Sequence, residues 1–157
     1  MRKGRRLAVD VGKARIGLAI SDQDGILATP FQTVARLEAL ELSAAAVCKS
    51  IDDFTFIEVY VGLPLNLQGK PTPSTQDALD LAQAIADSLA VPVRLIDERL
   101  TTVTASANLR LAGKNSKNSR HIVDQEAAAI ILEQALNSER ATNSVPGISI
   151  ADYLGRQ

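Results

Sequence analysis

Aromatic residues, cysteine and histidine are scarce in this chain of 157 residues, which holds two Tyr, three Phe, no Trp, one Cys and one His. The single cysteine, Cys48, excludes a disulfide within the chain, and no Cys/His cluster indicates a zinc site. No apolar run has the length of a membrane span. We therefore expect a protein without a membrane segment, in a reducing cytoplasm.

The chain also lacks an excess of positive or negative charge, because its net charge is only −1. A balance this close to neutral does not indicate a general binder of nucleic acid. Basic residues are nevertheless uneven: no acidic residue lies between Arg99 and Val123, where five basic residues occur. Such a strip could hold a polyanion, although a solvated loop is the simpler interpretation of the charges alone.

Hydrophobic residues make up 46% of the chain, enough for one globular domain with a sizeable core. We expect that domain to span residues 1–137, and residues 138–157 to form a flexible tail. The segment that follows the basic N-terminus contains Asp10 and is typical of a strand, which argues against a signal peptide.

The apolar pattern predicts an α/β fold with a mixed sheet of five strands and flanking helices. Short turns should join the first three strands into an antiparallel meander, with the fourth and fifth strands parallel to the first. The expected strands are 5–11, 15–21, 26–34, 56–62 and 91–96, and the expected helices are 37–51, a second capped by Ser74 or Thr75, a third capped by Thr101 or Thr102, and 122–136. Residues 113–119 should form a mobile loop.

Three acidic residues lie where burial should make a charge costly. Asp10 interrupts an apolar strand, Glu98 follows another, and Asp124 opens an apolar helix. A buried carboxylate requires a cation or another partner. Because ligands gather beyond the carboxyl ends of parallel strands, the topology predicts that these acids form one site. The alternatives are salt bridges or helix caps, and a cap is the better interpretation of Asp124 taken alone.

Carboxylate oxygens are the ligands that Mg²⁺ prefers, and Mn²⁺ accepts the same donors. Two such ions can activate water and stabilise the leaving oxygen when a phosphodiester bond is cleaved, without a histidine base. The acids therefore predict a metal-dependent phosphodiester hydrolase that binds Mg²⁺ or Mn²⁺.

Four blocks of the sequence resemble the YqgF (RuvX) family, in that family's order. They are VDVGKARIGLA (9–19), VGLP (61–64), DERLTT (97–102) and VDQEAAAIIL (123–132). The resemblance implies an RNase H-like fold and Asp10, Glu98 and Asp124 as the metal-binding catalytic acids. It also implies a nuclease that matures the 5′ end of the small-subunit ribosomal RNA precursor, or a Holliday junction resolvase acting in DNA recombination and repair.

Several polar residues are expected to contact the substrate, which would be precursor ribosomal RNA or branched DNA. They are Arg15, Asn66, Arg99, Thr102, Lys114, Lys117 and Arg120. Arg15 could equally be an ordinary exposed arginine with no role in binding. Thr102 could equally cap a helix. Ribosomal particles are a further expected partner, and the chain should be a monomer or a weak homodimer.

Two alternatives belong to other functional classes. Asp10, Gly12 and Gly17 have the spacing of the first phosphate loop in actin-like ATPases and sugar kinases. Those proteins duplicate the domain, whereas this chain has no internal repeat. The second alternative is a non-catalytic RNA-binding or transcription factor with the same fold, which the intact acids argue against.

Overall fold

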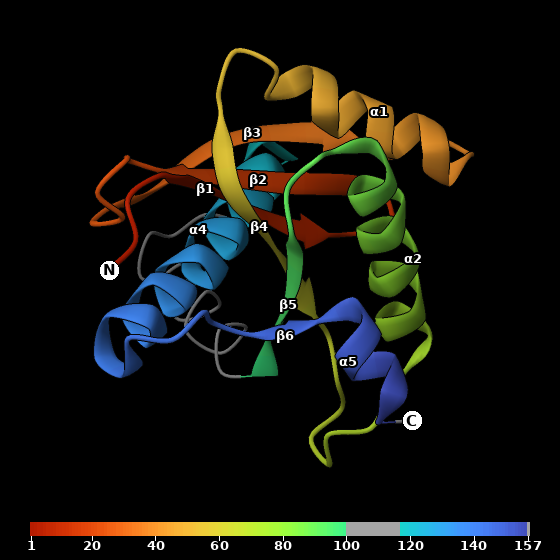
Figure 1. The fold of residues 1–157 in the computed structure, drawn as a ribbon. Coiled ribbons are helices and arrows are strands. Elements are labelled where there is room, and N and C mark those ends of the chain that lie inside the picture. Colours follow the sequence, from red (N-terminus) through yellow and green to blue (C-terminus); the bar gives the residue numbers. More distant parts are fainter. Residues whose placement is uncertain (100–116, 157) are drawn as a thin grey trace.

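In the computed structural model, which describes residues 1–99 and 117–156 (the backbone alone for 117–121), six strands form one sheet (Figure 1). Their order across the sheet is β3-β2-β1-β4-β5-β6. The strands are β1 (Arg5–Val11), β2 (Arg15–Ser21), β3 (Ala28–Ala35), β4 (Phe56–Leu63), β5 (Val93–Asp97) and β6 (Ile148–Ser149). The helices are α1 (Leu40–Ser50), α2 (Pro73–Ser88), α4 (Lys117–Thr142) and α5 (Ile150–Gly155).

The strand pairing confirms the predicted mixed sheet. Strands β1, β2 and β3 form an antiparallel meander, and β4 and β5 run parallel to β1. The carboxyl ends of β1, β4 and β5 therefore lie at one edge of the sheet. The third strand begins at Ala28, two residues later than expected, because Ile26 and Leu27 form the preceding turn with their amides bonded to Asp22.

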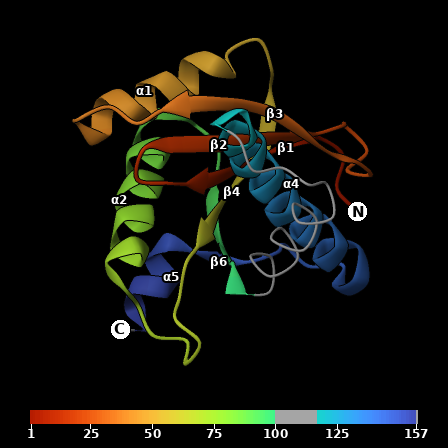
Figure 2. The same cartoon turned by 180° about the vertical axis from the view of Figure 1, so that it is seen from behind.

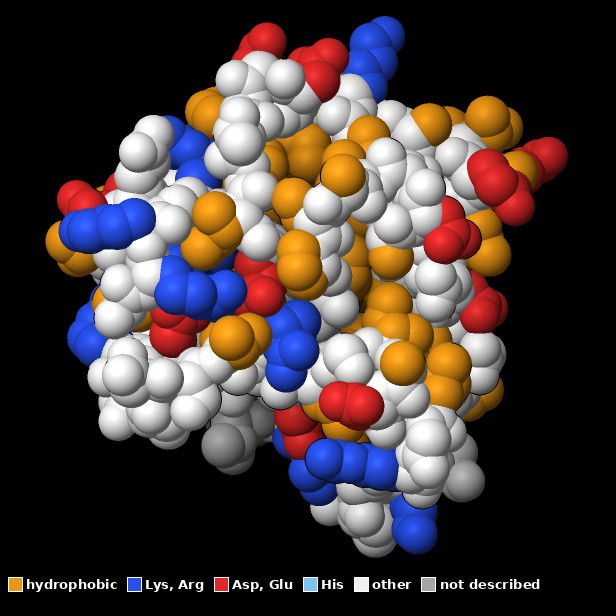
Figure 3. Space-filling view, in the orientation of Figure 1, with side chains coloured by type: hydrophobic (Ala, Val, Ile, Leu, Met, Phe, Trp, Pro, Cys, Tyr) orange, Lys and Arg blue, Asp and Glu red, His pale blue; other side chains and the backbone are white. Residues whose placement is uncertain are grey.

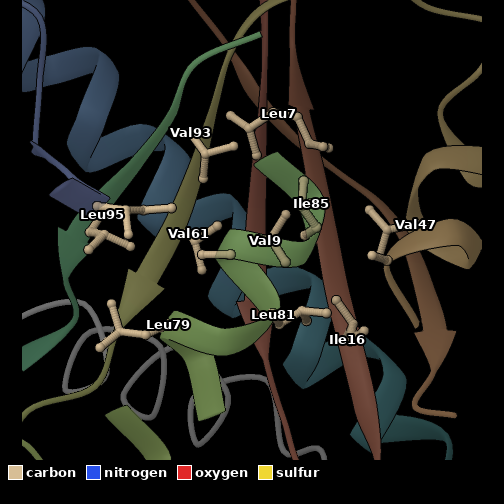
Figure 4. Packing of buried hydrophobic residues seen from close by; sticks show 14 of the residues in the cluster. Leu7, Val9, Ile16, Val47, Val61, Leu79, Leu81, Ile85, Val93 and Leu95 are labelled. Carbon is tan, nitrogen blue, oxygen red and sulfur yellow. The ribbon is translucent and has the colours of Figure 1, made fainter. Parts of the chain in front are cut away.

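Helices cover both faces of the sheet, and β1 divides its side chains between them. Leu7 and Val9 pack in the core beneath α1 and α2, which Figure 4 shows from close by. Ala8 belongs to the second core, which α4 covers on the opposite face (Figures 1 and 2). Since side chains alternate along a strand, Asp10 shares the face of Ala8 and is directed to the side of α4.

The helix after β4 begins earlier than its predicted caps. Thr72 is the N-cap of α2, and Pro73 occupies the first helical position. Thr75 completes a capping box with Thr72 and donates its hydroxyl to the carbonyl oxygen of Pro64. Ser74 or Thr75 as the cap is thus wrong, because a proline with no N–H to donate fits the first turn of a helix.

The helix that carries Asp124 is longer than predicted at both ends. It starts at Lys117, so Asp124 lies inside the helix and does not cap it. The expected loop 113–119 is wrong in its last three residues, which are helical, and residues 113–116 lie outside the described residues. The helix capped by Thr101 or Thr102 also falls outside the described residues.

The C-terminal residues differ most from expectation, because most of residues 138–156 are ordered elements and not a flexible tail. Strand β6 pairs antiparallel with β5 and adds a sixth strand to the five that were expected. Arg94 secures the turn by donating to the carbonyl oxygens of Pro146, at 2.7 Å, and Gly147, at 2.8 Å. In the following helix, Ile150 and Tyr153 are buried. Pro146 and Gly147 therefore mark a turn into an edge strand.

Charged residues are buried where β1 begins, far along the strand from Asp10. Arg6 is fully buried and Glu139, near the end of α4, is 3% exposed. Their side chains are joined at 3.1 Å, and Arg2 bonds to both Glu139 and Glu58. This network ties the N-terminal residues to α4. No helix among the described residues is long and apolar enough to cross a membrane.

Candidate metal and nucleic-acid site

Asp10 and Glu98 meet at the edge where the parallel strands end. Glu98 follows β5, and its amide donates to the carbonyl oxygen of Leu63 at 3.2 Å. The neighbouring Gly62 provides the space for the Glu98 side chain. A Cβ at Gly62 would lie 2.7 Å from Glu98 Cδ and 2.6 Å from Ile131 Cδ1. A glycine inside a strand often marks such a close approach.

The two carboxyl groups share a hydrogen bond, which Glu98 donates to Asp10. Burial, followed by the charge of Asp10, raises the pKa of Glu98 from 4.5 to about 9. Burial also raises the pKa of Asp10, and the charge of Asp124 adds to that increase. The pair therefore holds a proton at neutral pH, because two buried carboxylates in contact cannot both ionise without a cation.

Asp124 lies over β2, which is on the other side of β1 from β5 and Glu98. Gly17 pairs with Asp10 in the sheet and lies directly against the backbone carbonyl of Asp124, which a Cβ at Gly17 would strike. The side chain of Asp124 pairs with an arginine. Its Oδ2 accepts a hydrogen bond from Arg15 Nε at 2.8 Å.

The three predicted acids thus share one edge, with two in contact and the third paired to an arginine. Across the part of the chain that the structure describes, no group of three or more His, Cys, Asp and Glu side chains is arranged to hold a metal ion. The donor chemistry nevertheless fits Mg²⁺ or Mn²⁺, since all three side chains offer carboxylate oxygens. A dication beside Asp10 and Glu98 would replace their shared proton and relieve their repulsion.

The shared proton predicts how stability depends on pH without metal. A carboxyl whose pKa is raised on folding binds more protons when folded, so stability is lost as pH rises from about 4.5 to 9. In chelator, the free energy of unfolding of the wild-type protein should fall across this window relative to that of Glu98→Gln. The difference should grow by up to about 1.4 kcal/mol per pH unit. Urea midpoints at several pH values measure the difference. Parallel curves for the two proteins would contradict the shared proton.

On this edge Arg99 lies beside the tightly bonded turn that begins at Asn66. The side-chain oxygen of Asn66 accepts from the amides of Gln68, at 3.0 Å, and Lys70, at 2.9 Å. Arg99 pairs with Asp97 at 2.5 Å and lies beside Gly69, where a Cβ would be 3.1 Å from its guanidinium. The Asn66 oxygen therefore builds the turn, whereas Arg99 is 39% exposed and accessible to a phosphate.

Lys13 is a basic residue of this edge that the sequence interpretation missed. It is exposed in the turn after β1, where the amide of Gly12 donates to the carbonyl of Arg15 at 2.9 Å. Figure 3 shows acidic and basic side chains side by side at the end of the molecule where β4 and β5 finish. The predicted contacts Thr102 and Lys114, and the side chains of Lys117 and Arg120, lie outside the described residues.

Curated relatives match nearly the whole chain. A protein of Leifsonia xyli is 48% identical over 155 residues, covering 99% of each chain. A protein of Clavibacter michiganensis is 50% identical, covering 94% of this chain and 91% of its own. One of Streptomyces avermitilis is also 50% identical, covering 94% of each. All three are described as candidate pre-16S rRNA nucleases.

A solved structure with a similar fold is that of Thermus thermophilus RuvC in complex with a Holliday junction substrate. The TM-score is 0.57 over 88% of this chain and 96% of that chain, at 14% sequence identity. This likeness supports the expected RNase H-like fold. The model of the RuvX family, described as Holliday junction resolvase, matches residues 4–138. Together with the curated relatives, this match confirms the resemblance seen in the four sequence blocks, and the chain belongs to the RuvX family.

Proposed function

We propose that this protein is a metal-dependent endonuclease that matures the 5′ end of the small-subunit ribosomal RNA precursor. The observation that carries the proposal is the proton-sharing pair of Asp10 and Glu98, with the charge of Asp124 close to it. Buried acids with strongly raised pKa values at the carboxyl edge of a sheet are typical of functional sites. The relatives described as candidate pre-16S rRNA nucleases support the choice of substrate.

Each residue has a distinct role in the proposed reaction. Asp10, Glu98 and Asp124 would hold divalent cations by their carboxylate oxygens, and Asp10 and Glu98 would give up the proton that they share. The bound cations would supply an activated water and stabilise the leaving oxygen. Arg15 and Arg99, on either side of the acids, hold backbone phosphates of the substrate. Positively charged side chains placed in this way orient the scissile phosphate without reading sequence.

Branched DNA is the second candidate substrate. It is favoured by the family's description as Holliday junction resolvase. A resolvase acts on symmetric junctions and requires two active sites, so that activity would need a dimer. Cleavage of a single RNA strand at one position requires only one active site. The oligomeric state under cleavage conditions is therefore informative about the substrate.

A matched set of substrates tests the proposal. The set contains a transcript with the precursor 5′ extension, the same extension as single-stranded and double-stranded DNA, and a four-way DNA junction. We expect endonucleolytic cleavage of the transcript with Mg²⁺ or Mn²⁺ and none in excess chelator. Cleavage of the junction alone would identify a resolvase. Binding of RNA without cleavage of any substrate would favour the non-catalytic alternative.

The basic residues before Asp124 should strengthen binding through charge alone. The triple change of Lys114, Lys117 and Arg120 to Ala should weaken RNA affinity across sequences and leave Mn²⁺ affinity unchanged. Each phosphate contact that is lost should flatten the slope of log affinity against log salt by roughly one unit. Fluorescence anisotropy at several salt concentrations measures the slope. An unchanged slope would mean that these side chains do not contact the phosphates.

A further inference from the structure

Arg15 and Asp124 form an ion pair at the position where the proposed function needs a free carboxylate. Their atoms Nε and Oδ2 are 2.8 Å apart, and the side chains are 29% and 16% exposed. The pair is partly buried, and each side chain keeps some contact with solvent. The place of this pair calls for a functional explanation, because Asp124 lies over Gly17, the partner of Asp10 in the sheet.

The surrounding backbone allows side chains to exchange partners but resists movement of the elements themselves. Gly17 is in direct contact with the carbonyl of Asp124, and α4 packs along β1, β2 and β3. Asp124 can therefore change its partner only by rotating its own side chain. Arg15 begins β2 next to an exposed turn, so its long side chain can swing toward solvent while its backbone stays paired with Ala35.

Charge decides which partner each side chain takes. The guanidinium of Arg15 carries one positive charge and pairs with Asp124, one of three neighbouring acids. A dication bound to Asp10 and Glu98 attracts Asp124 more strongly than Arg15 does, and it repels Arg15. A guanidinium released in this way is suited to a phosphate, which it can bind with two hydrogen bonds.

The geometry points to Arg15 as an exchangeable cation that neutralises Asp124 in the metal-free protein and moves to a substrate phosphate when metal binds Asp124. This inference rests on the proposed function and extends it, because it couples metal binding to the grip on the substrate. The exchange involves no covalent step. Arg15 is a positioning residue until metal is bound and a substrate-binding residue afterwards.

Metal titration without nucleic acid tests the first half of the exchange. Arg15→Gln removes the competitor, so Mn²⁺ should bind about three- to tenfold more tightly than to wild type. Lys13→Gln is the matched control, since it removes a cation from the same hairpin but leaves the pairing of Asp124 with Arg15 in place. Its effect should be under about twofold. In an Asp124→Asn background, Arg15→Gln should have no further effect. Calorimetry measures all of these affinities.

The second half of the exchange is tested by spectroscopy and by substrate binding. In wild type, Mg²⁺ should shift the Arg15 Nε–H signal in a nitrogen–proton correlation spectrum and speed its exchange with water. Ca²⁺, used as a non-cleaving ion, should raise affinity for an RNA hairpin in wild type and do so several-fold less in Arg15→Gln. A denaturation curve of each variant verifies that it is folded.

The outcomes separate this inference from the proposed function. If wild type binds no Mn²⁺ or Mg²⁺, both the proposed function and the exchange are overturned. If wild type binds metal and Arg15→Gln binds it no more tightly than Lys13→Gln does, only the exchange is overturned, because Arg15 would then position Asp124 for the metal. An Arg15 signal that is unchanged at saturating Mg²⁺ would also overturn it.

Discussion

Asp10→Asn should abolish cleavage while leaving the protein folded. The change keeps the volume of the side chain and removes a carboxylate that the proposed metal site requires. Loss of charge stabilisation by metal should lower the cleavage rate by about a thousandfold or more, equivalent to roughly 4 kcal/mol in the transition state. The variant should be at least as stable as wild type in chelator, because Glu98 no longer faces a buried like charge.

Asp97→Asn is the matched control for this prediction. Asp97 precedes Glu98 in the chain, but it pairs with Arg99 and is 40% exposed. Its replacement should reduce the rate far less than Asp10→Asn does. Rates at saturating Mn²⁺ and denaturation curves for both variants provide the comparison. Full activity of Asp10→Asn would disprove its role as a metal ligand, and equal losses in the two variants would show that the edge responds to any change of charge.

The edge of the sheet on which the acids lie could be predicted from sequence because strand periodicity and topology determine it. A carboxylate at Asp10 breaks an apolar alternation, and the parallel arrangement of β1, β4 and β5 brings their ends together. The same periodicity separates Asp10 from Val9 and directs it to the side of α4. These are local rules with few exceptions, so they apply without knowledge of tertiary contacts.

Details that depend on side-chain partners could not be predicted in this way. The pairing of Arg15 with Asp124 joins residues 109 positions apart, and no periodicity specifies it. The C-terminal strand was missed because β6 is only two residues long and carries no pattern of its own. Its order comes from pairing with β5 and from the bonds of Arg94 to the turn. Tertiary context therefore determined both features.

A buried charge network forms the other end of the molecule, and its loss should have a large effect on stability. Glu139 accepts hydrogen bonds from Arg2 and Arg6, and Arg6 is fully buried. The bonds from Arg2 lower the pKa of Glu139 to about 2. A depressed pKa contributes stability that is present above about 4.5 and is lost as pH falls toward about 2. Tyr60 and Glu58 extend the network within the core.

Glu139→Leu should destabilise the protein by about 3–5 kcal/mol, because it leaves the guanidinium of Arg6 buried without a counter-charge. The double change Arg6→Met with Glu139→Leu should recover much of that loss, since a buried ion pair can be replaced by apolar side chains at little cost. Urea denaturation at neutral pH, with wild type and each single variant, completes the cycle. If the double variant is as unstable as Glu139→Leu alone, the cost comes from lost packing or from Arg2, and not from the uncompensated charge of Arg6.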